Sequence, residues 1–264
     1  MDLVYIIKKG EINSDLRYSL RSVEKFVPHD KIWIVGYKPF WVTNVRYIPV
    51  EQTENKWKNS VKNILAACNC ENISDDFVLM NDDFFAIKPI IDLKDSINLS
   101  LGSLKDSVDM HKTKNSNWHH AFELVYNLLK ELNIPEPYYD YESHTPLLIN
   151  RKKYLEVMNL PKVKEFMNTS NILHKRTLYK NIEKQYIPIT LNQDVKISVD
   201  SQVPVKTKVC DWISVADNES RSKFYPQLNN LLQELFPNPS KFETNDFDSN
   251  VIPYINSNKN SKYF

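Results

Sequence analysis

The polar residues with the clearest chemical potential are Asn81, Asp82 and Asp83, which directly follow the apolar run 77–80. If that run is a strand of an open α/β sheet, its carboxyl end faces the ligand crevice, so acids at this point are well placed for chemistry on a ligand. Mn²⁺ and Mg²⁺ take hard oxygen ligands, commonly one or two carboxylates together with the phosphates of a bound molecule. Asp82 and Asp83 are therefore candidate metal ligands; the alternative is a solvated turn in which an aspartate caps the next helix.

Two arginines and a histidine are further candidates. Arg17 and Arg21 lie four residues apart, which puts both on one face of a predicted helix. Guanidinium groups bind phosphate oxygens in a bidentate manner, although ordinary pairing with acids of the same helix is the alternative. His144 precedes an apolar run at 147–149, and it is a candidate general base or a ligand for metal or phosphate. The alternative for His144 is a structural histidine at the start of a strand.

Composition excludes several classes of site. The 264 residues include three glycines, roughly 1% against an average near 7%, and no two are close enough to form a glycine-rich phosphate loop. Phosphate binding would then depend on a metal and on arginines. The 34 basic and 33 acidic residues give a net charge of +1, which argues against binding nucleic acid by bulk electrostatics. The three cysteines have no metal-ligand spacing and indicate free thiols, and no serine-hydrolase or zinc-protease motif is present.

The segments between these candidates predict an α/β fold. Strands are expected at 3–7, 31–36, 45–50, 77–80 and 147–150, and helices at 15–26, 56–68, 118–132, 152–158, 162–167 and 227–235. The first strand, helix and second strand form a βαβ unit with parallel strands. We expect one domain over residues 1–243 with a small helical insert at about 93–139, followed by an extended or disordered tail at 244–264.

The amino terminus indicates where the protein acts. Its apolar run between Asp2 and Lys8 is too short for a signal sequence or a membrane-spanning helix. Free thiols are typical of a reducing compartment, and the lysine-rich, asparagine-rich composition is typical of an AT-rich bacterial or phage genome. The sequence therefore predicts a cytoplasmic protein of a bacterium or of a phage-infected host cell, with no membrane span.

Several of these segments together resemble the Stealth family of sugar-phosphate transferases, which includes capsular polysaccharide phosphotransferases. Residues 2–5, 15–28 and 31–35 are similar to its first two regions, and the run Leu-Arg-Tyr-Ser-Leu-Arg-Ser at 16–22 is the most specific part. Residues 58–60 are similar to its Phe-Asn-Ser step, residues 77–85 to its strand ending in Asn-Asp-Asp, and residues 144–146 to its His-x-Pro. The family's histidine after Asn-Ser is Val61 here, and Arg176 and Asp194 stand in for its fourth region.

The resemblance implies a GT-A-like, mostly parallel twisted sheet flanked by helices, a nucleotide-sugar donor, most readily a UDP-sugar, and a divalent cation, Mn²⁺ or Mg²⁺. It implies that Asp82 and Asp83 hold the metal beside the diphosphate. It assigns catalytic roles to His144, Asp83 and Arg21, and donor or phosphate binding to Tyr5, Gly10, Arg17, Arg21, Asn59, Asn63 and Arg176.

Three functions follow from this resemblance. The first is glycosyl transfer to a hydroxyl of a glycan or of a modified phage DNA base, with His144 or Asp140 as the base. The second is transfer of sugar 1-phosphate to a surface polysaccharide, as in the Stealth family. The third is a noncatalytic module that binds nucleotide sugars. The released nucleotide distinguishes the first two, because glycosyl transfer leaves a nucleoside diphosphate and phosphoryl transfer leaves a nucleoside monophosphate.

Overall fold

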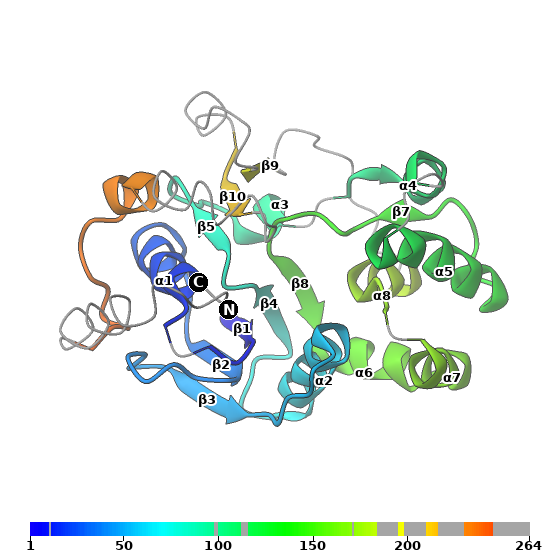
Figure 1. Cartoon of the computed structure of the whole chain (residues 1–264), viewed down its shortest axis with the longest axis horizontal. Coiled ribbons are helices and arrows are strands. Elements are labelled where there is room, and N and C mark those ends of the chain that lie inside the picture. Colours follow the sequence, from blue (N-terminus) through cyan, green and yellow to red (C-terminus); the bar gives the residue numbers. More distant parts are fainter. Residues whose placement is uncertain are drawn as a thin grey trace.

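A five-stranded sheet in the order β3-β2-β1-β4-β8 forms the centre of the protein (Figure 1). The computed structural model describes residues 1–10, 12–97, 100–111, 116–170, 172–183, 195–197, 210–215 and 230–244. The strands are β1 (Asp2–Ile7), β2 (Ile32–Gly36), β3 (Arg46–Pro49), β4 (Asp76–Met80) and β8 (Leu147–Asn150). β1 to β4 are parallel and β8 runs antiparallel to β4. The predicted βαβ start and mostly parallel sheet are confirmed.

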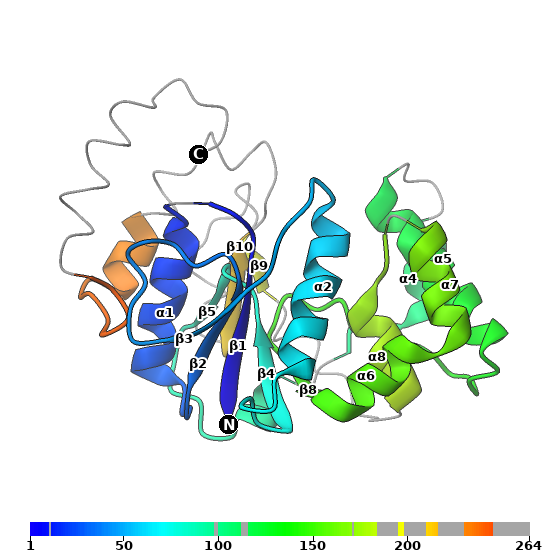
Figure 2. The ribbon, with the colours of Figure 1, turned by 90° about the horizontal axis from the view of Figure 1, so that it is seen from below.

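Helices cover both faces of this sheet. Figure 2 shows α1 (Ser14–Phe26) on one face and α2 (Lys56–Asn69) on the other. Successive strand residues point to opposite faces: Leu3, Tyr5 and Ile7 pack into the core under α1, whereas Val4 packs into the core that α2 shares. Because both faces are buried, the strands read as continuous apolar runs in the sequence.

The remaining elements form small sheets and a helical layer. β5 (Phe84–Ala86) pairs with β10 (Trp212–Val215), which pairs with β9 (Val195–Ile197), and β6 (Gly102–Ser103) pairs with β7 (Tyr139–Asp140). The further helices are α3 (Leu93–Ile97), α4 (Leu104–His111), α5 (Asn117–Glu131), α6 (Arg151–Asn159), α7 (Pro161–Thr169) and α8 (Lys175–Glu183). α3 belongs to the core under α1, while α5, α6, α7 and α8 contribute to one shared core. The expected helical insert was the segment at about 93–139. The shared core also takes in α6, α7 and α8, which follow β8 in the chain.

Helix α8, like the short helices α3 and α4, is an element that the sequence pattern missed. Its buried residues include Thr177, Lys180 and Asn181, and Asn181 Nδ2 donates to the Tyr139 carbonyl oxygen at 2.8 Å. Because polar residues occupy buried positions of this helix, the sequence shows no apolar stripe of helical period. The other predicted helices that fall on described residues are confirmed within about two residues at each end.

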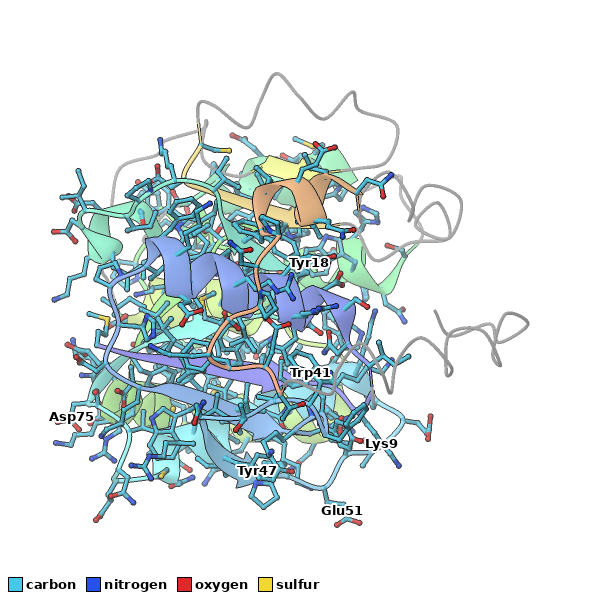
Figure 3. The ribbon with its side chains drawn as sticks, turned by 90° about the vertical axis from the view of Figure 1, so that its left-hand side faces the viewer. Lys9, Tyr18, Trp41, Tyr47, Glu51 and Asp75 are labelled. Atoms are coloured by element: carbon cyan, nitrogen blue, oxygen red, sulfur yellow. The ribbon has the colours of Figure 1, made fainter. Side chains whose placement is uncertain are left out.

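The segment 230–244 returns to the start of the fold. Its residues 230–235 are helical, as predicted for that part of 227–235. Thr43 N donates to the Phe242 carbonyl oxygen at 2.9 Å, and Thr244 N donates to the Trp41 carbonyl oxygen at 2.9 Å. Figure 3 looks onto this face, where the segment lies over α1 with Tyr18 and Trp41 nearby. The predicted tail lies, apart from Thr244, outside the described residues.

Gly36 is a glycine that the fold requires. Its φ is +108°, and a Cβ there would lie 2.4 Å from the Ile7 carbonyl oxygen, a combination that only glycine tolerates. A Cβ at Gly10 would meet nothing within 4 Å. In the described part of the chain, no helix has the length and apolar character needed to cross a membrane.

Candidate active site

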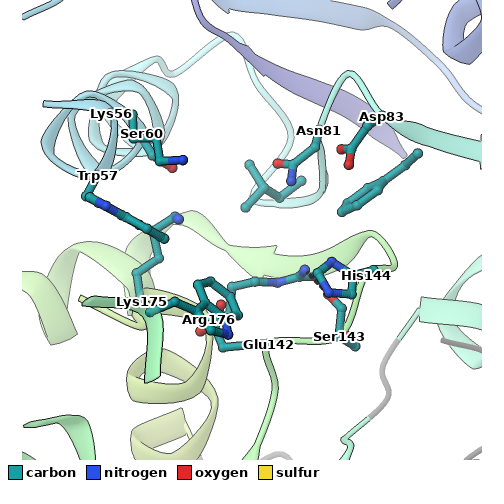
Figure 4. Close-up of a pocket in the computed structure, with 13 residues that line it drawn as sticks. Lys56, Trp57, Ser60, Asn81, Asp83, Glu142, Ser143, His144, Lys175 and Arg176 are labelled. Carbon is teal, nitrogen blue, oxygen red and sulfur yellow. Dashed lines mark hydrogen bonds between the residues drawn. The ribbon is translucent and has the colours of Figure 1, made fainter. Parts of the chain in front are cut away.

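A pocket of about 260 Å³ opens at the carboxyl edge of the parallel strands, where β4 ends (Figure 4). Three helices reach it with their first turns, and the connection between β7 and β8 forms its floor. Its lining residues are Lys56, Trp57, Ser60, Leu79, Asn81, Asp83, Phe84, Trp118, Glu142, Ser143, His144, Lys175 and Arg176. Of the predicted site residues, the pocket brings together Asp83, His144 and Arg176.

The acidic end of β4 supplies one wall. Asn81, Asp82 and Asp83 are half-buried, and Asn81 and Asp83 line the pocket. The Asp82 carboxylate accepts a hydrogen bond from Asn13 Nδ2 at 2.8 Å. Asn13 is the N-cap of α1, since its Oδ1 accepts from Leu16 N at 3.1 Å. The turn that carries the acids is thus tied to the start of α1.

The donor set of this wall suits a hard divalent cation. Among the described residues no group of three or more His, Cys, Asp or Glu side chains is arranged to hold a metal. Two neighbouring carboxylates are nevertheless what Mg²⁺ commonly takes from a protein when substrate phosphates complete its coordination. Asp82 and Asp83 therefore fit a metal that is shared with a bound diphosphate.

His144 lies across the pocket from Asp83 (Figure 4). Arg176 holds the segment around it, because its Nη1 donates to the Ser143 carbonyl oxygen and its Nη2 to the Thr145 carbonyl oxygen. These contacts bracket His144 on both sides. The expected role of Arg176 in phosphate binding stays a prediction; in the structure both of its terminal nitrogens donate to carbonyl oxygens on either side of His144.

The buried Glu142 and His174 and the half-buried Lys175 form a cluster at the pocket that the sequence did not reveal. Glu142 Oε1 accepts from Thr177 N at 3.1 Å, and Oε2 lies 3.8 Å from His174 Nδ1. His174 Nε2 lies 2.9 Å from the Trp118 carbonyl oxygen, so it carries the proton and donates it there. The signals in the sequence were the acid two residues before His144 and the adjacent bases 175–176, but only the packing of α8 brings them together.

Burial sets the titration of this cluster. Burial disfavours ionisation of Glu142, but the basic side chains of His174, Lys175 and Arg176 outweigh it, so the pKa of Glu142 is lowered. Burial lowers the pKa of His174 and the pKa of Lys175. The pocket therefore holds an ionised Glu142 beside a histidine that is neutral at pH 7.

Arg17 and Arg21 do not line the pocket. Arg21 is 5% exposed, and its Nε and Nη2 donate to the two Glu243 carboxylate oxygens at 2.7 Å each. Arg17 Nε donates to Glu243 Oε2 at 2.7 Å. Arg17 and Arg21 were expected to bind phosphate, with Arg21 catalytic, and these roles stay predictions. In the structure both guanidinium groups pair with the buried Glu243 carboxylate, 222 residues beyond Arg21 and 226 beyond Arg17.

Two other expected donor-binding residues, Tyr5 and Asn59, have structural partners. Tyr5 is fully buried under α1, its hydroxyl lies 2.9 Å from Ser19 Oγ, and burial raises its pKa. Asn59 Nδ2 donates to the Thr53 carbonyl oxygen at 2.6 Å and so supports the turn before α2. Neither side chain lines the pocket, and the expected donor-binding roles of Tyr5 and Asn59 stay predictions.

The last expected donor-binding positions remain predictions. Asn63 is buried, and its Oδ1 has no hydrogen-bond partner among the described residues. Gly10 follows β1 in open space. Asp140, the alternative candidate for the general base, accepts from Ser107 Oγ at 2.8 Å and from Glu142 N at 2.8 Å. Asp194 lies outside the described residues.

Solved structures of known proteins share the fold of this chain. No protein-family model and no curated protein sequence matches this chain. The crystal structure of the galactosyltransferase LgtC in complex with donor and acceptor sugar analogues is similar, with a TM-score of 0.54 and 10% identity over 91% of this chain and 98% of that one. An active-site mutant of LgtC matches with a TM-score of 0.50 and 11% identity over 87% of this chain and 96% of that one. The predicted GT-A-like fold is confirmed.

Proposed function

We propose that the protein is a glycosyltransferase that moves a sugar from a nucleotide-sugar donor, in the first instance a UDP-sugar, to an acceptor hydroxyl. The observation that carries this proposal is the pocket at the end of β4, where Asp83 and His144 face each other at the carboxyl edge of a GT-A-like sheet. Ligands of open α/β sheets bind at this edge. LgtC, which has this fold, is described as a galactosyltransferase with donor and acceptor sugar analogues.

Asp82 and Asp83 would hold the metal, Mn²⁺ or Mg²⁺. When bound, such an ion neutralises charge that develops on a departing nucleoside diphosphate. Asn13 orients the Asp82 carboxylate through its 2.8 Å hydrogen bond, and orientation of a ligating carboxylate by a second hydrogen bond strengthens metal sites. A metal held here would replace the glycine-rich loop that the sequence lacks.

His144 is the residue that we assign to the acceptor side. It lies in the pocket on a segment fixed by Arg176, and fixed placement of a general base within reach of the hydroxyl is what proton transfer requires. Arg176 then acts through His144. Arg17 and Arg21 both pair with Glu243 and support the C-terminal segment, so we assign them no part in this proposed reaction.

The test is incubation of the full chain with a panel of nucleotide sugars and Mn²⁺, followed by mass analysis of the released nucleotide. A nucleoside diphosphate supports glycosyl transfer. Asp83→Ala should abolish release and Asp106→Ala, an exposed acid on α4, should not. If no nucleotide is released from any donor, the enzymatic proposal fails; donor binding that ignores both a chelator and Asp83→Ala would then indicate the noncatalytic module.

Sugar 1-phosphate transfer is the second candidate, and the Leu-Arg-Tyr-Ser-Leu-Arg-Ser run at 16–22 is the feature that favours it. In the structure, this run packs under the C-terminal segment and contributes Arg17 and Arg21 to the Glu243 contacts. Release of a nucleoside monophosphate in the same assay would establish this reaction and exclude glycosyl transfer. For either reaction we propose a cytoplasmic setting, with a surface glycan or modified phage DNA as the acceptor.

A further inference from the structure

Two tryptophans from separate elements meet at one end of the pocket. Trp57 comes from the first turn of α2 and Trp118 from the first turn of α5, and their ring centroids lie 5.7 Å apart at 31°. Trp118 is supported from behind by His174 and Phe122, whose rings lie 4.3 and 5.9 Å away. Trp57 is half-buried and lines the pocket. The pair is a rigid aromatic surface that faces the pocket.

Several polar groups around this surface have no hydrogen-bond or ion-pair partner in the described part of the chain. Among the described residues, neither tryptophan Nε1 has a hydrogen-bond acceptor, and Lys175 Nζ makes no ion pair or hydrogen bond although Lys175 is half-buried. Lys56 Nζ lies 5.4 Å from the Trp57 ring and has no acidic partner there. Unpaired donors that line a pocket are satisfied by a ligand that brings acceptors.

The charge of these groups favours an anion. Lys56 and Lys175 are basic side chains next to the tryptophans. The amino-terminal turns of α2, α5 and α8 also lie at the pocket. Helix amino termini add positive potential of their own. Glu142 is ionised and interacts electrostatically with Lys175, although no salt bridge joins the two. The lining has three basic side chains, Lys56, Lys175 and Arg176, and two acidic ones, Asp83 and Glu142. The basic side chains Lys56 and Lys175 lie at the tryptophan end, which favours a negative group on the ligand there.

The tryptophan end is separate from the acids of the proposed donor site. Figure 4 shows Trp57, Lys56 and Lys175 on one side of the pocket and Asp83 and His144 on the other. A donor diphosphate held at Asp83 would leave the tryptophan end for the second substrate. This inference therefore rests on the proposed function, whose acceptor it describes.

A sugar ring suits this surface better than a nucleobase. The apolar C–H face of a pyranose packs flat on an aromatic ring, and its hydroxyl oxygens accept from indole N–H groups. The two indoles contact each other and are inclined, so no planar base fits between them. The chain has a net charge of +1, so it does not have the excess of basic residues with which proteins bind the backbone of DNA.

We infer that Trp57 and Trp118 form the acceptor subsite, and that the acceptor is an acidic saccharide whose ring lies on the indoles and whose carboxylate or phosphate is bound by Lys175 and Lys56. Among the described lining residues, the tryptophan end combines an aromatic surface with two lysines that make no ion pair. The shared chemistry is a negatively charged sugar; whether the charge is a carboxylate or a phosphate is decided by the experiment.

The test uses tryptophan fluorescence of the full chain during titration with D-glucuronate, glucose 6-phosphate, glucose, inorganic phosphate and a short oligothymidylate. We expect at least one acidic sugar to bind about tenfold more tightly than glucose and than phosphate, the difference expected for a charge-assisted contact. Lys175→Gln should abolish the preference and Trp57→Ala should weaken binding of acidic and neutral sugar alike. Lys58→Ala, an exposed lysine next to Trp57 that does not line the pocket, should change neither.

Several results would overturn the inference: equal affinity for glucose and the acidic sugars, no binding of any sugar, tighter binding of oligothymidylate, or displacement of the acidic sugar by UDP with Mn²⁺. Lys56→Gln, at an exposed position, repeats the charge test if Lys175→Gln does not fold. Nucleotide release from donors is measured on the same preparation. Release without binding of acidic sugar refutes the acceptor subsite only, whereas binding without release refutes the proposed function.

Discussion

Replacing Glu243 with glutamine tests whether the arginine pair of α1 stabilises the fold or serves the ligand. The Glu243 side chain is 2% exposed. It accepts from Arg21 Nε and Nη2 and from Arg17 Nε, all at 2.7 Å, and from Ser240 N at 2.8 Å and Ser240 Oγ at 3.0 Å. Glutamine keeps the shape, removes the charge, and turns one of the two acceptor oxygens into a donor that faces a guanidinium.

The expected loss is large because Arg21 remains charged and buried. Removing one partner of a buried ion pair costs about 3–5 kcal/mol of the free energy of unfolding. For a chain of this size, each kcal/mol corresponds to about 2–4 °C, so the melting temperature should fall by about 10 °C. The double variant Arg21→Met with Glu243→Leu should recover part of this loss, because no unpaired Arg21 charge then stays inside.

Thermal and urea unfolding at pH 7 measure the effect. Lys105→Gln is the control, because the Lys105–Asp109 ion pair has the same 2.7 Å separation but both side chains are exposed, 63% and 42%. An exposed pair contributes little to stability, so this variant should unfold close to the wild type. The Arg21–Glu243 and Lys105–Asp109 ion pairs differ chiefly in burial, so a difference in the loss of stability can be attributed to burial.

The pH dependence gives an independent check. Burial opposes ionisation of Glu243, but hydrogen bonds from Arg21, Ser240 and Arg17 outweigh it and hold its pKa below the ordinary value of 4.5. A group with a lowered folded-state pKa contributes stability that is present above its unfolded pKa and lost as the pH falls through the folded one. The difference between wild type and Glu243→Gln should therefore shrink below about pH 4.5.

A Glu243→Gln protein as stable as the wild type at pH 7 would refute this reasoning. A raised KM for the nucleotide sugar with unchanged stability would point instead to a ligand-binding role for the arginine pair. Either result would restore Arg17 and Arg21 to the donor site.

Three further predictions follow from the structure. Gly36→Ala should lower the free energy of unfolding by about 2 kcal/mol, because of the φ of +108° and the 2.4 Å approach to the Ile7 carbonyl oxygen; Gly10→Ala is the control in the same urea titration, and equal stabilities would contradict the prediction. Asp83→Asn should reduce Mn²⁺-dependent release of nucleotide about 100-fold or more without changing the melting temperature, and unchanged release would remove Asp83 from the site. Burial lowers the pKa of His174 from 6.5, so its stabilising neutral form is complete above pH 6.5 and is lost as the pH falls through the lower folded value. An NMR titration of wild type against His174→Gln measures that pKa, and a value of 6.5 or above would be inconsistent with the structure.

The elements with regular apolar spacing could be predicted from the sequence. β1, α1 and β2 follow from continuous apolar runs and from a 3.6-residue stripe with an Asn cap at residue 13. The position of Asn81 and Asp83 at the ligand edge follows from the rule that parallel strands present their carboxyl ends there. The helices α3, α4 and α8 were not predicted. In α8 the buried positions include Thr177 and Asn181, which bond to Tyr141 and Tyr139 far along the chain, so the sequence shows no apolar pattern there.

The use of each charged side chain was decided by the tertiary structure. The sequence by itself determined that Arg17 and Arg21 share a helix face and that acids follow β4, because both are consequences of local geometry. It did not determine that Glu243 would form ion pairs with the arginines, or that Trp57, Trp118 and Lys175 would line one pocket. Those contacts join residues far apart in the chain. Their energies depend on how deeply each group is buried and on which hydrogen-bond donors remain unpaired, and both are defined only once the chain has folded.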